Sequence, residues 1–201
     1  MRFNENSDNL NGSNFIMEQD KQLTFRIASS QSEFDQIHQL NYQTFVEEIP
    51  QHSENPDRSL VDRFHDDNTY FICLSDEAEV VGMVSIREER PFSLDQKISN
   101  LDALLPRSSA ICEIRLLSVK KGYRNGRVFY GLIKILAEYC LEKGFDLAII
   151  SGTERQLKLY GHLGFKVFAN PVGKPEALYY PMYLTIENAL PAFVTLKELH
   201  D

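Results

Sequence analysis

Cysteine is scarce in this sequence, and its scarcity limits the classes of protein that it can encode. There are three cysteines, Cys73, Cys112 and Cys140, and their spacing fits neither a disulfide framework nor a metal-binding motif. Each of them falls within an apolar strand or helix pattern. We therefore expect three reduced core thiols, no metal site and a cytoplasmic protein.

Positive charge and long hydrophobic runs are also in short supply. The chain has 29 acidic residues against 21 Lys and Arg, for a net charge of -8. Nucleic acids and anionic membranes both favour a basic face, so we expect neither as a partner. No apolar run is long enough to span a bilayer, and the first 22 residues are polar, so we expect no membrane insertion and no secretory signal.

The remaining composition is that of an ordinary globular domain. With 201 residues, 43% of them hydrophobic and 25% charged, the chain can bury a single core. Residues 1–21 are rich in Asn, Asp, Ser and Glu and are expected to form a flexible tail. The folded domain is expected over 22–187, followed by a tail or short helix over 188–201, in a monomer or homodimer.

Hydrophobic periodicity predicts an α/β chain with the order β-α-α-β-β-β-α-β-α-β-β. A capping box at residues 30–33 opens a first helix, which is predicted to stop before Pro50. A short helix is predicted around 59–65, and the segment 170–173 is predicted to be a turn. The long link over 92–105 has leucines at helical spacing, and we expect it to shape a substrate pocket.

A strand, a basic loop and a helix follow one another at the centre of the chain. The strand is predicted over 110–119, and the loop over 120–127 contains four Lys or Arg and no acid. The helix after it is predicted to end at Gly144. Because the first N–H groups of a helix lack partners and favour negative charge, we predict a seat for a pyrophosphate or phosphopantetheine group. The alternative is a solvated charge run.

This loop and a later stretch together resemble motifs of the GNAT superfamily of N-acyltransferases. Tyr123-Arg124-Asn125-Gly126-Arg127-Val128 resembles the family's [Q/R]-x-x-G-x-[G/A] loop, and Tyr160-Gly161-His162-Leu163-Gly164-Phe165 resembles its Y-x-x-x-G-F pattern. The order of elements agrees over residues 23–187. The resemblance implies a mixed, mostly antiparallel central sheet flanked by helices, with acyl-CoA or acetyl-CoA as co-substrate. It assigns phosphate binding to Arg124, Asn125, Gly126, Arg127 and Val128.

Val128 stands where the family has a small residue, and we expect its side chain to crowd the pyrophosphate. The same resemblance implies that the central strand splays from its neighbour. Backbone N–H groups of Leu117, Ser118 and Val119 would then bind the thioester carbonyl and the pantetheine arm. Tyr160 would protonate the departing thiolate, and the alternative is a packing aromatic.

A narrower resemblance concerns the acyl-homoserine-lactone synthases and N-acyl amino acid synthases. It is carried by residues 45–48 (FVEE), 61–64 (VDRF) and 112–117 (CEIRLL). Members take long acyl chains, in many cases from acyl carrier protein, so a carrier-protein donor is kept as an alternative. Because Glu113 and Arg115 are two apart, where lactone synthases have a spacing of three, we do not expect a lactone synthase. Phe45 and Asp62 are expected to contact the acceptor.

Glu113 and Arg115 point to one face of an otherwise apolar strand, where buried charge is costly unless paired. In one interpretation Glu113 is a general base or an anchor for the acceptor's ammonium, and Arg115 holds a carboxylate of the acceptor. In the other they form a structural ion pair. The sequence thus predicts an N-acyltransferase acting on a small-molecule amine, with a medium or long acyl chain and an amino acid as the favoured pair. The alternatives are an ordinary acetyltransferase of a small amine or protein, and a non-catalytic acyl-CoA-binding module.

Overall fold

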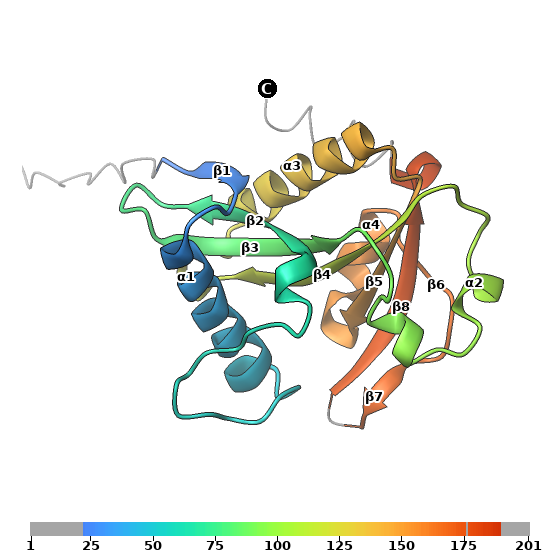
Figure 1. Cartoon of the computed structure of the whole chain (residues 1–201), viewed down its shortest axis with the longest axis horizontal. Helices are drawn as coiled ribbons and strands as arrows, with labels where there is room; N and C mark the ends of the chain where they lie inside the picture. Colours follow the sequence, from blue (N-terminus) through green and yellow to red (C-terminus); the bar gives the residue numbers. More distant parts are fainter. Residues whose placement is uncertain (1–21, 176, 190–201) are drawn as a thin grey trace, which may run out of the picture.

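The computed structural model describes residues 22–175 and 177–189, and these build an eight-stranded sheet around which all helices are arranged (Figure 1). The spatial order is β1-β2-β3-β4-β5-β8-β6, and β7 pairs with β8. The strands are β1 (Thr24–Ile27), β2 (Asn68–Leu74), β3 (Val80–Arg87), β4 (Ile111–Val119), β5 (Leu147–Thr153), β6 (Lys166–Val167), β7 (Val172–Lys174) and β8 (Ala177–Thr185). The α-helices are α1 (Gln31–Tyr42), α2 (Leu101–Leu104), α3 (Arg127–Lys143) and α4 (Leu157–His162).

Shorter helical turns connect these elements. They are η1 (Gln43–Glu48), a π-helix, and the 3-10 turns η2 (His65–Asp67), η3 (Leu94–Gln96), η4 (Lys121–Tyr123) and η5 (Glu154–Gln156). Of the pairings between described strands, β4 with β5 is parallel and all others are antiparallel. The expected mixed, mostly antiparallel sheet flanked by helices is confirmed.

Helices α1 and α3 cover opposite faces of the first half of the sheet (Figure 1). Successive side chains of a strand point to opposite faces, and β2 shows this directly. Tyr70 and Ile72 pack in the cluster with Ile37 of α1, whereas Phe71 and Cys73 pack in the cluster with α3. The capping box predicted for α1 is present, with Ser30 at the N-cap and the Glu33 carboxylate returning to the Ser30 N–H.

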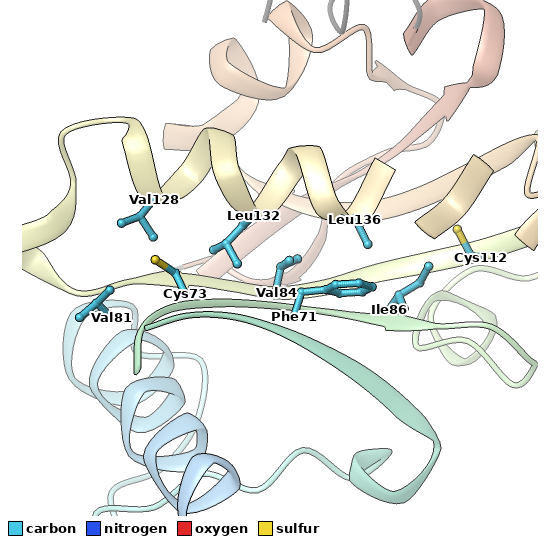
Figure 2. Packing of buried hydrophobic residues seen from close by; sticks show 9 residues of the cluster. All are labelled: Phe71, Cys73, Val81, Val84, Ile86, Cys112, Val128, Leu132 and Leu136. Atoms are coloured by element: carbon cyan, nitrogen blue, oxygen red, sulfur yellow. The ribbon is translucent and has the colours of Figure 1, made fainter. Parts of the chain in front are cut away.

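The core beneath α3 is closely packed (Figure 2). Val128, Leu132 and Leu136 project from one side of the helix onto β2, β3 and the start of β4. A Cβ added at Gly82 of β3 would lie 2.4 Å from Val128 Cγ1, so the missing side chain allows the helix to approach the sheet. This contact fixes the first turn of α3, which follows the basic loop.

The second half of the sheet is covered differently on its two faces. Ile150 of β5 packs with Tyr160, Leu163 and Phe165, which come from α4 and the turn after it. Ile149, on the other face, packs with the link, whose buried residues are Phe92, Leu94, Ile98 and Leu101. The two halves of the sheet meet only where β4 pairs with β5.

Several local expectations are wrong. Residues 59–64 are not helical, and the 3-10 turn η2 follows them, while the predicted turn over 170–173 leads into the short strand β7. The helical spacing of the link is present in two short segments, η3 and α2. The first helix continues beyond Tyr42 as a π-helix, which no hydrophobic period signals. The predicted tail over 1–21 lies outside the described residues, as does most of 188–201. No helix in the described part of the chain combines the length and apolarity that crossing a membrane requires.

Candidate active site

The central feature of the site is the split between β4 and β5. Their parallel pairing covers three positions and ends at Glu113 with Ile149, although both strands continue. Beyond that point β5 stays paired with β8 as far as Thr153, while β4 stays paired with β3. The edge of β4 over 114–119 therefore faces an opening and not a strand partner.

A β-bulge lies in the part of β4 that is not paired with β5. Met83 pairs with Ser118 and Ser85 pairs with Arg115, so two β4 residues oppose the single residue between them on β3. Leu116 has φ 54°, a left-handed conformation that is strained for a branched side chain. A bulge turns the strand and re-aims its backbone groups, and here it does so at the mouth of the split.

A cavity of about 670 Å³ adjoins this mouth. Its walls are the end of β4 (Leu117, Ser118, Val119), the basic loop (Lys121, Tyr123, Arg124, Gly126), the start of α3 (Phe129, Tyr130), the segment 153–159 (Thr153, Arg155, Gln156, Leu159) and η1 with its flank (Thr44, Glu47, Glu48, Ile49). We call it the donor cavity. The predicted residues Leu117, Ser118, Val119, Arg124 and Gly126 all line it.

Within the loop, the polar groups already have internal partners. Gly126 is the N-cap of α3 with φ 96°, a conformation that glycine adopts without strain. Asn125 Oδ1 accepts a hydrogen bond from the Arg127 N–H at 3.3 Å, so it caps the first turn. Arg124 donates from both terminal nitrogens to the carboxylate of Glu48 at 2.9 Å and from Nε to the Val119 carbonyl at 2.7 Å. A phosphate would share Arg124 with Glu48.

The expectation that Val128 crowds the pyrophosphate is wrong. Its side chain is 1% exposed and points away from the donor cavity, onto the sheet (Figure 2). The second helical position of α3 faces the core because Gly82 leaves room for a branched side chain there. The backbone of the first turn of α3 lies on the donor side. Its N–H groups are the same whatever side chain residue 128 carries.

A second cavity, of about 610 Å³, passes through the split and shares the residues Leu117, Thr153 and Gln156 with the donor cavity. One end, which we call the acceptor end, is polar and is lined by Asn41, Phe45, His52, Asp62, Arg63, Ser93, Lys97, Glu113 and Arg115. The other end, which we call the apolar channel, is lined mostly by Ile133, Leu136, Ala137, Cys140, Leu141, Leu163, Phe165, Leu184, Ile186 and Ala189, with Asp146 and Thr185 as polar members.

The apolar walls thus come from α3, α4 and β8, and not from the link. Of the link, Ser93 and Lys97 reach this cavity, whereas Phe92, Leu94, Ile98 and Leu101 are buried against Ile149. The link, expected to shape a substrate pocket, therefore does not wall the apolar channel. Its contribution is polar and lies at the acceptor end.

Tyr160 lies beside the split, on α4. Its ring packs edge-on to Phe165, and a Cβ at Gly152 of β5 would lie 2.9 Å from its Cδ2. The ring is 8% exposed and lines the second cavity. Burial raises the pKa of the phenol well above its usual range, so the hydroxyl stays protonated at every pH near neutrality.

Glu113, Arg115 and Asp62 form a buried ionic chain at the acceptor end. Arg115 donates to Glu113 at 3.1 Å and to Asp62 at 2.8 Å, and its guanidinium lies 5.0 Å from the centre of the Phe64 ring. The Glu113 carboxylate also accepts from the N–H and hydroxyl of Ser93, at 2.8 and 2.6 Å. The predicted pair is therefore a real ion pair, with all of its carboxylate oxygens engaged.

Sequence analysis did not identify Asn41, Phe64 or Ser93 as members of this site. Ser93 contacts Glu113 across twenty residues of chain, and Asn41 reaches the cavity from α1. A buried polar residue in the last turn of an amphipathic helix was the available signal for Asn41. No pattern in the sequence indicates the other two contacts.

A sheet that splits beside a bulge, with a basic loop and a helix N-terminus at the mouth, agrees with the GNAT-like fold that the motifs implied. A family model described as "N-acyl amino acid synthase FeeM" matches residues 36–186, and the chain belongs to this family. The chain is therefore an N-acyltransferase, as predicted from its motifs. Among proteins with curated descriptions, none matches the sequence.

Solved structures of similar fold are consistent with this family. The CoA-dependent acyl-homoserine lactone synthase BjaI is 21% identical, covering 88% of this chain and 90% of its own, with a TM-score of 0.71. The lactone synthase LasI is 16% identical over 86% and 94%, with a TM-score of 0.70. FeeM, from uncultured soil microbes, is 17% identical over 84% and 92%, with a TM-score of 0.66. The suspected relationship to both groups is confirmed at the level of the fold.

Proposed function

We propose that this enzyme transfers a medium or long acyl chain from a phosphopantetheine thioester to the amine of an amino acid. The observation that carries this proposal is the continuity between the donor cavity and the apolar channel through the β4/β5 split. An acetyl group needs no such channel. A chain of methylene groups would gain about 0.8 kcal/mol for each group removed from water there.

The donor would lie with its phosphates at the basic loop and its pantetheine arm along β4. Arg124 and the first N–H groups of α3 favour negative charge at the mouth. The unpaired edge of β4 offers backbone N–H groups to the arm amides and to the thioester carbonyl. The last residues of this edge, Leu117 to Val119, line the donor cavity.

In the reaction, the amine nitrogen attacks the thioester carbonyl carbon, and the C–S bond breaks as the tetrahedral intermediate collapses. Backbone N–H groups at the bulge stabilise the oxyanion. Tyr160 donates its hydroxyl proton to the departing sulfur, and the amine's proton restores the phenol through solvent. The net result is an amide, a free thiol and no change in proton count. Because the site is buried, the pKa of the thiolate is raised together with that of the phenol, which keeps the transfer feasible.

Glu113 and Asp62 act in this proposal as positioning residues and not as general bases. The oxygens of Glu113 accept from Ser93 and Arg115, and those of Asp62 accept from Arg115 and Asn68. Held between them, Arg115 lies at the acceptor end, where it would meet the carboxylate of an amino acid. Phe45 lines the same end, as expected for a residue in contact with the acceptor.

The relatives support both halves of the proposal. BjaI is described as CoA-dependent, and FeeM as an N-acyl amino acid synthase. We take acyl-CoA as the first donor to test. An acyl carrier protein presents the same phosphopantetheine thioester, and remains the second donor to test.

The test is a transfer assay with acetyl-, octanoyl-, dodecanoyl- and hexadecanoyl-CoA against the twenty proteinogenic L-amino acids, with thiol release and product mass as readouts. We expect N-acyl amino acids from the longer donors. Turnover of acetyl-CoA alone would instead identify an ordinary acetyltransferase, and donor binding without any turnover a non-catalytic module. If no CoA donor binds, the same assay is repeated with dodecanoyl-acyl carrier protein.

A further inference from the structure

The carboxamide of Asn41 is buried without any hydrogen-bond partner. The residue is 1% exposed, and among the described residues neither its Nδ2 nor its Oδ1 finds a donor or acceptor. A polar group buried in this way destabilises the folded state, and native proteins rarely leave both polar atoms of one amide unsatisfied. Asn41 lines the acceptor end of the second cavity, so a bound molecule there can supply both partners.

The backbone that follows Asn41 divides the two cavities. Asn41 is the last residue but one of α1, and after Tyr42 the helix widens into the π-helix η1, at whose end the Ile49 N–H bonds to the Thr44 carbonyl at 2.9 Å. Asn41 and Phe45, four residues apart, line the second cavity, whereas Thr44, Glu47 and Glu48 line the donor cavity. One stretch of helix therefore presents different side chains to each cavity. π-Helical turns are found frequently at such functional positions.

The groups around Asn41 favour an anion near the amide. Arg63, Lys97 and Arg115 line this end of the cavity together with the acids Asp62 and Glu113, which gives an excess of one positive charge. His52 lines it too, and burial lowers its pKa, so the ring is neutral at pH 7. The Nε of Arg115 is also buried without a partner, which leaves a second donor available in the same space.

We propose that Asn41 is the residue that selects an α-amino acid over a simple amine. The inference rests on the proposed function and names the residue that reads the acceptor. An α-amino acid carries a donor and an acceptor on neighbouring atoms, an amine and a carboxylate. Oδ1 of Asn41 accepts from the amine N–H, which leaves the nitrogen lone pair for the thioester, and Nδ2 donates to a carboxylate oxygen.

The sharpest test is Asn41→Leu, which keeps the size of the side chain and removes both polar atoms. If the amide exists for the acceptor, the free variant melts higher than the wild type, by on the order of 3 °C, because an unsatisfied buried amide is gone. Its KM for the best amino acid rises about 10- to 100-fold, which is the effect of losing hydrogen bonds to charged groups. Its KM for dodecanoyl-CoA stays unchanged.

Selectivity supplies a second readout. The wild type should prefer each L-amino acid to the amine that lacks its α-carboxylate, and Asn41→Leu should lose most of this preference. The matched control is Thr44→Val, which removes another buried, unpartnered polar atom three residues away, on the donor cavity. Because Thr44 lines the donor cavity and not the acceptor end, any effect of this control should fall on the KM for dodecanoyl-CoA, and the KM for the amino acid should stay as it is.

Three results overturn the inference. One is a lower melting temperature for Asn41→Leu, which would make the amide structural. Another is an unchanged KM for the amino acid with the wild type active. The last is equal use of amino acids and of the corresponding amines without the α-carboxylate by the wild type. If the wild type acylates no amino acid at all, the proposed function itself fails, and that outcome is visible before any variant is made.

Discussion

Tyr160 is the residue whose chemistry is easiest to separate from its packing. The Phe165 ring and the backbone at Gly152 hold its aromatic face, and these contacts do not involve the hydroxyl. For Tyr160→Phe we expect a melting temperature within about 2 °C of the wild type. The kcat should fall by roughly 100-fold or more, because the thiolate loses its proton donor.

The pH dependence of this step follows from the raised pKa. A phenol whose pKa lies above its ordinary value of 10 remains protonated as the pH rises towards 10, so the wild-type kcat should show no loss from Tyr160 up to that pH. A kcat for Tyr160→Phe close to that of the wild type would remove the residue from the mechanism. Binding of dodecanoyl-CoA to the variant serves as the control for an intact site.

Glu33 is a residue at which stability should respond clearly to acid. Its carboxylate accepts from Arg26 and from the N–H groups of Ser29 and Ser30, and these bonds lower its pKa from 4.5 to about 2. A lowered pKa contributes stability that is fully present above pH 4.5 and is lost as the pH falls towards 2. Glu33→Gln should therefore cost about 2 kcal/mol of unfolding free energy at pH 7.

The measurement is urea unfolding at a series of pH values between 2 and 7. The difference between wild type and variant should shrink as the pH falls through this window. Glu77→Gln, at an exposed position in the β2–β3 turn, is the control and should show little difference at any pH. If the difference in unfolding free energy between wild type and Glu33→Gln stays constant across this window, the negative charge of Glu33 contributes nothing, and the variant has lost only part of the helix cap.

Among the elements, helix α3 lies between the core and the donor cavity. A substitution of Val128 tests whether this side chain serves the core alone or also affects donor binding. Its side chain packs against Leu132 and the sheet, with Gly82 opposite. Val128→Ala should cost about 2 kcal/mol of unfolding free energy, because it leaves a cavity in the core. The Kd for CoA should stay within about twofold of the wild type, which equilibrium unfolding and calorimetry measure side by side. Tighter CoA binding by the alanine variant would mean that the valine does obstruct the donor.

At this same scale, the sequence predicted what depends on local chemistry. The capping box of α1, the glycine end of α3 at Gly144 and the strand β4 all follow from short-range patterns that the structure repeats. The orientation of Val128 did not follow, because it depends on a glycine forty-six positions earlier. Leu116 gives no sign of its left-handed backbone either, since the bulge arises from pairing with β3.

The same distinction between local patterns and long-range contacts applies to the residues of the site. The motifs indicated Tyr160 and the basic loop because each lies in one contiguous stretch of sequence, and the structure brings both to the cavities at the split. The network around Arg115 required contacts from Asp62 and Ser93, which lie 53 and 22 residues away and are brought there by the fold. Such long-range partners leave no period in a single sequence.

At the scale of the whole molecule, the split sheet separates binding into three regions that meet at one point. The donor cavity, the acceptor end and the apolar channel converge beside Leu117, where β4 has left β5 and the bulge has turned its backbone. In the proposed reaction, the acyl chain and the amine would approach the thioester from different sides. A substitution in one of these regions should therefore change the kinetic parameters for the substrate group bound there and leave those for the other groups unchanged.

The length of the acyl chain should then be set by α3 and not by the link. Ala137 lines the apolar channel, and a phenylalanine there would occupy space that a long chain needs. For Ala137→Phe we expect the kcat/KM for hexadecanoyl-CoA to fall by roughly tenfold or more, since each lost methylene contact in such a pocket has a measurable effect. The kcat/KM for acetyl-CoA should change little, so the optimum moves to shorter donors.

Ala103→Phe provides the matched comparison, because the same change falls on the exposed helix α2 of the link. Because Ala103 is exposed and lines neither cavity, this variant should show no shift in chain length. Equal losses for all donors in Ala137→Phe would indicate damage to the fold, which its melting temperature reports independently. A shift in the preferred acyl length that is confined to Ala137→Phe, with both variants stable, would place the acyl chain along α3, the helix that begins at the basic loop. One helix would then hold both ends of the donor, its charged end at the first turn and its apolar end two to three turns later.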